Sequence, residues 1–312
     1  MLYRAFNALL LLQLTLIPVT AASEVIGSPD AAVPTPAVPV QYVKHLFDIE
    51  GLVLPSDVVV SGERVYVVDG GGHRIVATDH SGRYLFDFNG TEDNRLNGPV
   101  GITTDSDGRI YVCDSGNGRV QIFDGNGDFI RLFDVKDEAG QIARPIDLLV
   151  NEFRDTIYIS DGSNHKILAY SMKGEFVFEW GKKGKENQEF RFPATLDMDA
   201  ERMVYVVDIL NTRVQRFTET GQWNANIAGW GVLPGNLFRP KGVSLDHNGL
   251  IYVTDSYMDV IQVFRDQQFL YALGDESDKP RKFTAPGGIY INQSRIYVVE
   301  MFAKKVGVYE LE

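Results

Sequence analysis

The chain has 312 residues, of which 42 are Asp or Glu and 30 are Lys or Arg, so its formal net charge is −12 at pH 7. An acidic chain repels the phosphate backbone overall, and we therefore expect no nucleic-acid partner. The single cysteine, Cys113, excludes an internal disulfide. It lies in the apolar run "IYVCD", where we expect a small buried strand residue.

Residues 1–22 have the pattern of a secretory signal peptide. Arg4 supplies the positive charge, an uncharged apolar run covers residues 8–19, and small residues follow at Ala21 and Ala22. The run is shorter than the roughly 20 residues that span a bilayer, and no later run is long and apolar enough, so we expect no membrane span. Cleavage would release a secreted protein, periplasmic or extracellular.

Residues 23–40 are rich in Pro and Ala and poor in large apolar side chains, which predicts an extended linker. The folded domain is then expected over residues 41–312. Its first run, "QYVKHLFDIEG" at residues 41–51, is a predicted strand.

The rest of the chain is a sixfold repeat. Each copy contains a run such as "IYVCD" that ends in an acid, and these acids are 45 to 47 residues apart. They are Asp69, Asp114, Asp161, Asp208, Asp255 and Glu300. A proline opens a further apolar run before each acid, at Pro55, Pro99, Pro145, Pro193, Pro240 and Pro286. A turn and a third strand follow each acid, and an aromatic fourth strand follows in units one to five, so these units predict four strands each.

One short acidic stretch of the second unit resembles the start of a calcium loop. In "DGNGD", residues 124–128, the positions that a calcium loop reserves for Gly and Glu hold Phe129 and Val135. Asn-Gly between two β-rich runs indicates a hairpin turn instead. We therefore interpret the repeated acid as architecture, accepting hydrogen bonds from backbone amides of the adjacent turn.

Four strands per unit without helical periodicity predict an all-β fold, a six-bladed β-propeller with four-stranded blades. The sixth unit stops after its third strand, and residues 41–51 resemble the fourth strand of the other units. We expect this N-terminal strand to complete the last blade and close a monomeric ring.

The repeated pattern, Pro-x-[Gly/Asp]-[Ile/Val] followed by Tyr-Val-x-Asp-x-x-Asn-x-Arg, resembles the NHL-repeat family of six-bladed propellers over residues 41–312. The resemblance implies a scaffold whose loops carry the function. A related amidating lyase has zinc-binding histidines directly after the motif prolines. Those positions hold no histidine in this sequence: Ser56, Val100, Ile146, Ala194, Lys241 and Gly287. We expect no cofactor and no catalytic residue.

Two other sets of residues bear on an enzymatic alternative. Lactonase-type propellers resemble this family and hold a cation near the central channel, for which Asp57, Asp147 and Asp197 would be the candidates here. Asp at this position is also ordinary for the repeat, so we expect no metal. His73 and His165 are equivalent residues four positions after the motif acid, and two histidines are fewer than the three ligands of a usual catalytic zinc.

The turns between second and third strands change from polar in units one to three to apolar in units four to six. The apolar turn residues are Ile209, Leu210, Tyr257, Met258, Met301 and Phe302. Exposed together they would form a patch that binds a protein or peptide; alternatively they pack under neighbouring loops. Sequence alone therefore predicts a secreted propeller that serves as a protein- or peptide-binding or scaffolding module. The alternative is an enzyme of the amidating-lyase or lactonase type with a metal at the channel.

Overall fold

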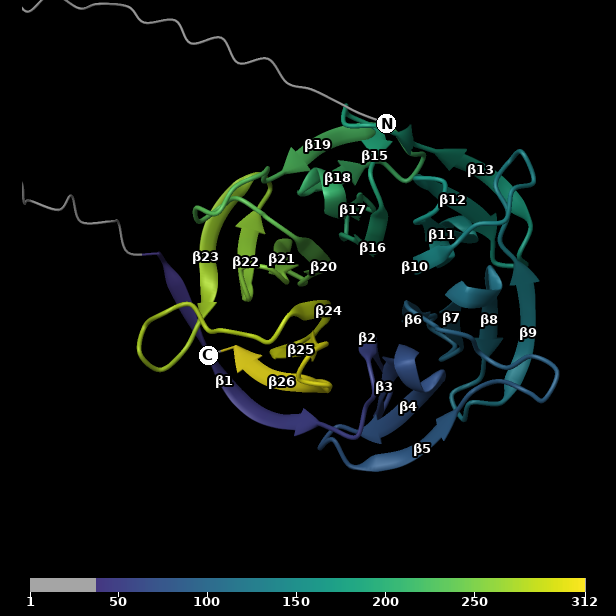
Figure 1. The fold of residues 1–312 in the computed structure, drawn as a ribbon, viewed down its shortest axis with the longest axis horizontal. Coiled ribbons are helices and arrows are strands. Elements are labelled where there is room, and N and C mark those ends of the chain that lie inside the picture. Colours follow the sequence, from purple (N-terminus) through teal and green to yellow (C-terminus); the bar gives the residue numbers. More distant parts are fainter. Residues whose placement is uncertain (1–37, 312) are drawn as a thin grey trace, which may run out of the picture. The chain divides into compact units, whose positions relative to one another are not determined.

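The computed structural model describes residues 38–311, and its regular structure is almost entirely β-strand (Figure 1). Four sheets have four strands each, paired in chain order. Their bounds are β2 Pro55–Ser61, β3 Arg64–Asp69, β4 Arg74–Asp79 and β5 Tyr84–Phe88; β6 Ile102–Thr104, β7 Ile110–Asp114, β8 Arg119–Phe123 and β9 Phe129–Asp134; β10 Pro145–Asn151, β11 Thr156–Asp161, β12 Lys166–Ser171 and β13 Phe176–Trp180; β16 Pro193–Met198, β17 Val204–Asp208, β18 Arg213–Phe217 and β19 Trp223–Ile227. These are the four strands per repeat that the sequence predicts. The expected signal peptide at residues 1–22 lies outside the described residues.

The remaining repeats form one eight-stranded sheet in the order β20-β21-β22-β23-β1-β26-β25-β24. Its strands are β20 Pro240–Leu245, β21 Leu250–Asp255, β22 Val260–Arg265, β23 Gln268–Gly274, β24 Pro286–Asn292, β25 Arg295–Glu300, β26 Lys305–Leu311 and β1 Val40–Ile49. A small two-stranded sheet, β14 Lys182–Lys183 with β15 Glu189–Phe190, lies in the loop before β16.

The N-terminal strand closes the ring as the sequence predicts. From Val43 to Ile49, β1 pairs antiparallel with the C-terminal strand β26. The strand starts at Val40, and residues Val40 to Tyr42 also pair parallel with β23. Six separate four-stranded sheets are therefore not observed, because β1 is long enough to pair with both of its neighbours and joins the last two repeats into one sheet.

The sheets stand around a central axis as in a propeller (Figure 1). The first strand of each repeat lies innermost, and the fourth lies on the outside. The second and third strands are the most buried, because both of their faces pack against neighbouring sheets: β7 and β11 have no exposed residue. Each core cluster accordingly combines side chains of adjacent repeats, such as Val59 and Tyr66 with Ile102 and Ile110.

A tight turn with a left-handed residue joins the second and third strands of each repeat. Three of these turns contain a short 3-10 segment, and the residue before the third strand has a positive φ there: 54° at His73, 64° at Gly118 and 55° at Thr212. The segments are Gly70–Gly72, Ser115–Asn117 and Ile209–Asn211, with a further one, Glu152–Arg154, in the β10–β11 turn. Gly, Asn and His tolerate this conformation better than β-branched residues, yet Thr212 also adopts it.

The repeated acid stabilises this turn, as predicted, but it also binds a segment that the sequence did not indicate. Asp114 is fully buried and accepts hydrogen bonds from the side chains of Asn117 and Arg119, at 2.8 and 2.7 Å. It also accepts one from the backbone N–H of Asn97, at 2.7 Å, in the loop before the first strand of the same repeat. The acid thus ties the turn to that loop, and its role is architectural.

Two smaller predictions concern burial and the membrane. Cys113 is fully buried, as expected for a strand residue, and burial raises the pKa of its thiol well above the usual range. Across residues 38–311 no helix has the length and apolar character needed to cross a bilayer.

Candidate functional site

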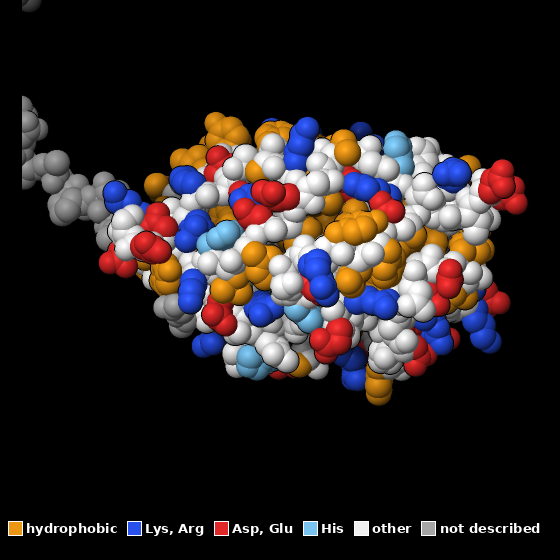
Figure 2. All heavy atoms as spheres, turned by 90° about the horizontal axis from the view of Figure 1, so that it is seen from below, with side chains coloured by type: hydrophobic (Ala, Val, Ile, Leu, Met, Phe, Trp, Pro, Cys, Tyr) orange, Lys and Arg blue, Asp and Glu red, His pale blue; other side chains and the backbone are white. Residues whose placement is uncertain are grey.

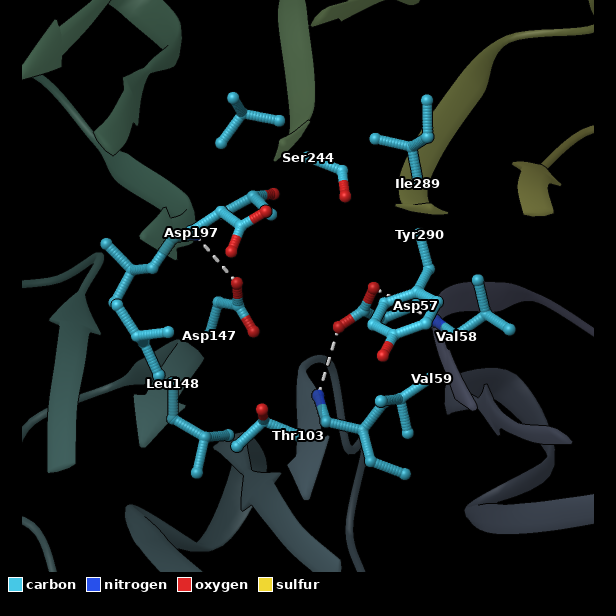
Figure 3. A pocket seen from close by; sticks show the side chains of 15 residues that line it. Asp57, Val58, Val59, Thr103, Asp147, Leu148, Asp197, Ser244, Ile289 and Tyr290 are labelled. Atoms are coloured by element: carbon cyan, nitrogen blue, oxygen red, sulfur yellow. Dashed lines mark hydrogen bonds between the residues drawn. The ribbon is translucent and has the colours of Figure 1, made fainter. Parts of the chain in front are cut away.

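The innermost strands enclose a small cavity on the central axis (Figure 3). Its volume is about 60 Å³. The carboxyl groups of Asp57, Asp147 and Asp197 point into it from β2, β10 and β16, and Ser244 and Tyr290 also line it, with Tyr290 beside Asp57 (Figure 3). The structure thus brings together the three carboxylates that the sequence named as candidates for a channel cation.

Two of these carboxylates are anchored in the same way by backbone N–H groups. Asp57 accepts from Val58, at 2.9 Å, and from Ile102 on β6 of the next repeat, at 3.0 Å. Asp197 accepts from the residue after it, at 2.7 Å, and from Leu245 on β20 of the next repeat, also at 2.7 Å. Each carboxylate therefore joins the inner strands of two adjacent repeats where no sheet hydrogen bonds connect them.

Asp147 makes one such bond and has one unsatisfied oxygen. Its Oδ2 accepts from the N–H of Leu196 on β16, at 2.8 Å. Its Oδ1 is buried without a hydrogen-bond partner among the described residues, and the residue is only 5% exposed. Gly101 faces this carboxylate, and a Cβ there would lie 2.6 Å from the carbonyl oxygen of Ile146. The glycine at position 101, two residues after a motif proline, thus has a steric reason.

Burial dominates the electrostatics of this cavity. It raises the pKa of Asp57 to about 7, opposed by the two N–H donors, and the negative charge of Asp197 raises it further. Burial likewise raises the pKa of Asp197 to about 6 and that of Asp147 well above its usual range, the latter also because of the charge of Asp57. Near neutral pH Asp57 is therefore partly protonated.

The space beside these acids and the distances between them limit what the cavity can hold. Within residues 38–311, no three or more His, Cys, Asp or Glu side chains converge closely enough to hold a metal ion. A cavity of about 60 Å³ admits water but not a substrate beside the carboxyl groups. The arrangement can bind water or exchange protons, and its hydrogen bonds serve to join the repeats.

The two matched histidines do not meet. His73 accepts a hydrogen bond from the N–H of Gly98 through Nδ1, at 2.8 Å, and His165 accepts one from Phe192, at 3.1 Å. Each contact links a turn to the loop of the next repeat. Both histidines are thus turn residues with equivalent structural roles, as the sequence suggested.

The loops before the first strands and the turns between second and third strands lie on one face, which we call the loop face. Direct backbone hydrogen bonds join them within a repeat: Leu210 donates to Arg191 at 3.1 Å, and Ser256 donates to Arg239 at 3.0 Å. This contact recurs in other repeats, because the motif acid holds both segments. These hydrogen bonds hold the two sets of loops together on that face.

The structure divides the six apolar turn residues. Phe302 is 76% exposed, and Tyr257 and Leu210 are more than half exposed. Met258 and Met301 are partly buried. Ile209 is buried in the core with Ile146 and Ala194, so the expectation that it belongs to an exposed patch is wrong. Both alternatives for these turns are thus realised, since adjacent residues of one turn point in opposite directions.

Sequence reasoning missed the loop between β19 and β20. In "GWGVLPG", residues 229–235, the side chains of Trp230, Val232 and Leu233 are 73%, 55% and 66% exposed. The sequence contains a signal for this exposed loop: an apolar run between glycines that includes a proline and lacks the alternation of apolar and polar residues typical of a strand. Figure 2 shows hydrophobic side chains standing out at the upper edge of the molecule in that view, among scattered charges.

Comparisons with known proteins agree with this architecture. The model of the NHL repeat matches residues 96–123. No curated protein sequence matches the chain. Solved structures with a similar fold include a streptogramin B lyase, with a TM-score of 0.63 at 14% identity over 86% of this chain and 98% of the lyase.

Two further structures show the same likeness. Virginiamycin B lyase from Staphylococcus aureus has a TM-score of 0.58 at 15% identity, over 82% of this chain and 80% of that one. A protein provisionally named as a gluconolactonase has a TM-score of 0.63 at 13% identity, over 87% and 92%. Identities this low bear on the fold and not on the activity. The chain is a β-propeller protein that contains an NHL repeat.

Proposed function

We propose that the protein is a binding propeller whose loop face takes a protein or peptide partner. The observation that carries this proposal is the distribution of exposed apolar side chains. Fourteen large hydrophobic residues are exposed within residues 38–311, and nine of them lie on the loop face. These nine are Val53, Leu54, Ile142, Leu210, Trp230, Val232, Leu233, Tyr257 and Phe302. The other five lie on outer strands or on the opposite turns.

This distribution favours an interface over chance. Scattered exposed apolar residues are normal, but their concentration on one face is typical of a binding surface. Aromatic residues such as Trp and Tyr dominate many interfaces because they bury large areas with few rotatable bonds. Tyr257 is held in place by Phe238, whose ring stacks on it at 4.1 Å between centroids. A fixed aromatic ring loses little conformational entropy when a partner covers it.

Charge suggests the chemistry of the partner. Arg239 and Lys304 are exposed beside Phe238 and Phe302 in the sequence, and neither forms an ion pair within the described part of the chain. Unpaired cations at the rim of an apolar surface favour acidic groups and speed association. The partner we infer is therefore a protein or peptide segment that combines apolar and acidic side chains.

An enzymatic role has weaker support. The lyases and the lactonase-like protein share the fold with this chain at 13–15% identity. Their activities cannot be transferred on that basis, since one propeller scaffold hosts unrelated functions. The three channel carboxylates could serve as acids or bases, but the cavity beside them is too small for a substrate. We therefore place binding ahead of catalysis.

Two finer features belong to the same proposal. We count the ring as six blades, with the eight-stranded sheet as two blades, because only the three pairs from Val40 to Tyr42 connect its halves. The six motif prolines support this count. We also propose secretion with cleavage after residue 22, which rests on the sequence pattern of the N-terminus.

The test of binding is a triple replacement on the loop face, Leu210→Ser, Tyr257→Ser and Phe302→Ser. A matched control carries Tyr84→Ser, Ile130→Ser and Val177→Ser, which are exposed apolar residues on outer strands. Wild type and both variants are used as bait to capture partners from the native secreted fraction. Separately, the intact mass of the secreted wild-type protein shows whether the chain begins at residue 23.

We expect the loop-face variant to lose at least ten-fold of a specifically captured partner while its melting temperature stays within about 3 °C of wild type, as for surface substitutions. The control should capture normally. Equal capture by all three proteins would refute the proposed surface. A large drop in melting temperature would show that these side chains support the core.

A further inference from the structure

An apolar groove of about 480 Å³ is lined mainly by β22, β23 and the β19–β20 and β23–β24 loops. Its volume is within the range of small-molecule sites. Val260 and Ala272 of the two strands are buried, whereas Val232 and Leu233 of the β19–β20 loop are 55% and 66% exposed. The buried side chains thus form the base of the groove and the exposed ones its rim, and an occupant would cover apolar surface that faces water.

The lining of the groove does not suit a peptide. Ala272 pairs with Gln262 on one side and with Val40 on the other, because β23 lies between β22 and β1 (Figure 1). A peptide that binds by adding a strand needs an unpaired edge, and a polyproline segment needs aromatic rings, but no aromatic residue of the described chain lines this groove. The amides of a peptide would therefore lie unsatisfied against aliphatic side chains. An unbranched alkyl chain has no such groups.

Two lysines give the groove an anion-binding character. Lys279 and Lys282 line it, and neither forms an ion pair within residues 38–311. Lys282 donates one hydrogen bond to the carbonyl of Met258, another lining residue, at 2.8 Å, which holds its ammonium at the groove and leaves two N–H donors. One acid lines the groove, Asp275, and its Oδ1 accepts hydrogen bonds from Ser277 and from the N–H of Lys279 within its own turn.

We propose that this groove binds a single-chain carboxylate, a free fatty acid of about eight to twelve carbons. Its alkyl chain would lie over β22 and β23, and its carboxylate would bind Lys279 and Lys282. Each methylene that leaves water tightens binding by roughly four-fold, and the apolar stems of the two lysines add to the covered surface. The proposal concerns a small molecule and is independent of partner binding by the loop face.

The rim of the groove is fixed before any ligand binds. Gln262 on β22 accepts a hydrogen bond from the N–H of Gly235 at 2.7 Å and donates one to the carbonyl of Asn236 at 2.6 Å. Asn236 in turn donates its N–H to the carbonyl of Leu233 at 2.9 Å. These bonds secure the β19–β20 loop above the strands. A preformed groove requires less ordering on binding than a flexible one.

The test is isothermal titration calorimetry of the full chain with octanoate, decanoate, decanol and decyltrimethylammonium, each below its critical micelle concentration. We expect one equivalent of decanoate to bind, about five-fold or more tighter than octanoate because two more methylenes are buried. Decanoate should also bind about three-fold or more tighter than decanol or the decyl cation, since exposed lysines contribute a modest attraction.

Substitutions test the two parts of the site separately. Leu233→Asp places a carboxylate at the rim and should weaken decanoate binding at least ten-fold, whereas Ile142→Asp, at a residue that is 68% exposed on another loop, should bind like wild type. Lys279→Gln combined with Lys282→Gln should weaken decanoate about three-fold or more and leave decanol unchanged, with the exposed Lys304→Gln as control. The triple serine variant of the loop face should bind decanoate normally, so the two proposals can fail independently.

Several results would overturn the proposal. They are the absence of saturable decanoate binding up to about 1 mM, equal affinities for decanoate and decanol, or several equivalents bound per chain. Self-association of the wild-type chain that Leu233→Asp abolishes would overturn it too, because the groove would then be an interface between copies. Loss of the captured protein partner from Leu233→Asp, without decanoate binding to wild type, would assign the groove to that partner instead.

Discussion

Replacing Asp57 by Asn should remove much of the pH dependence of the folding stability. Burial raises the pKa of this carboxyl to about 7 in the folded protein, compared with 3.8 for an unperturbed aspartate. The folded protein therefore retains the proton at a pH where the unfolded chain has lost it. The resulting stabilisation is fully present below pH 3.8 and is lost as the pH rises through about 7.

The size of the effect follows from the two pKa values. The difference between about 7 and 3.8 corresponds to about 4 kcal/mol of unfolding free energy, lost at up to ~1.4 kcal/mol per pH unit. The raised pKa values of Asp147 and Asp197 act in the same direction. The lowered pKa of His165, caused by its burial, acts in the opposite direction, because charging this side chain disfavours the folded state as the pH falls.

The amide differs from the carboxylate in two ways. It has no charge to lose, so the pH-dependent contribution of this residue disappears. Its single oxygen accepts one N–H well, whereas Asp57 accepts from both Val58 and Ile102, and the lost bond costs about 1–3 kcal/mol at every pH. We therefore expect Asp57→Asn to be less stable than wild type at pH 5 and to recover by about 2.5 kcal/mol relative to it by pH 8, since part of the total effect already lies below pH 5.

The measurement is urea unfolding, followed by tryptophan fluorescence, from pH 5 to 8.5 at constant ionic strength. Starting at pH 5 avoids the acid limb on which surface carboxylates such as Asp79, whose pKa is lowered to about 2 by its bonds to Ser81, are protonated. Asp128→Asn, at an exposed position, should keep the wild-type slope. If the slopes of wild type and Asp57→Asn coincide, the account of the channel as a set of buried, partly protonated carboxyls is wrong.

Two further predictions concern closure of the ring and its inner packing. Ile49 in β1 is 1% exposed, and Ile49→Ala should lower the free energy of unfolding by about 2–5 kcal/mol, measured by chemical denaturation. The control is Val53→Ala, because Val53 is half exposed, and it should change the free energy of unfolding by less than about 0.5 kcal/mol. Equal effects would show that β1 does not seal the core. Gly101→Ala should reduce the melting temperature, since the new methyl group meets backbone 2.6 Å away beside Asp147 and overpacking costs about 1–3 kcal/mol. Gly229→Ala, with open space at the same atom, is its control, and a variant of Gly101 that melts like this control would contradict the steric argument.

Sequence by itself determined the repeat and the strands. Apolar alternation and turn residues are local properties, and six copies reinforced each pattern, so the four strands per unit and the closing strand at residues 41–51 could be predicted. The buried Cys113 and the architectural acids followed from the same comparison of equivalent positions. The three carboxylates at the channel could be named because they follow motif prolines.

Tertiary structure decided the features that depend on which neighbour a side chain meets. Ile209 and Leu210 are adjacent and similarly apolar, yet one is buried and the other exposed, because the turn directs them to opposite sides. The pKa of Asp57 depends on the low polarity of the cavity, on an N–H from the next repeat and on the charge of Asp197. The double pairing of β1 depends on how close β23 lies to it. These contacts join residues that are far apart in the chain. A repeat pattern predicts the strands of each unit, but it does not predict which side chains of the next unit pack against them.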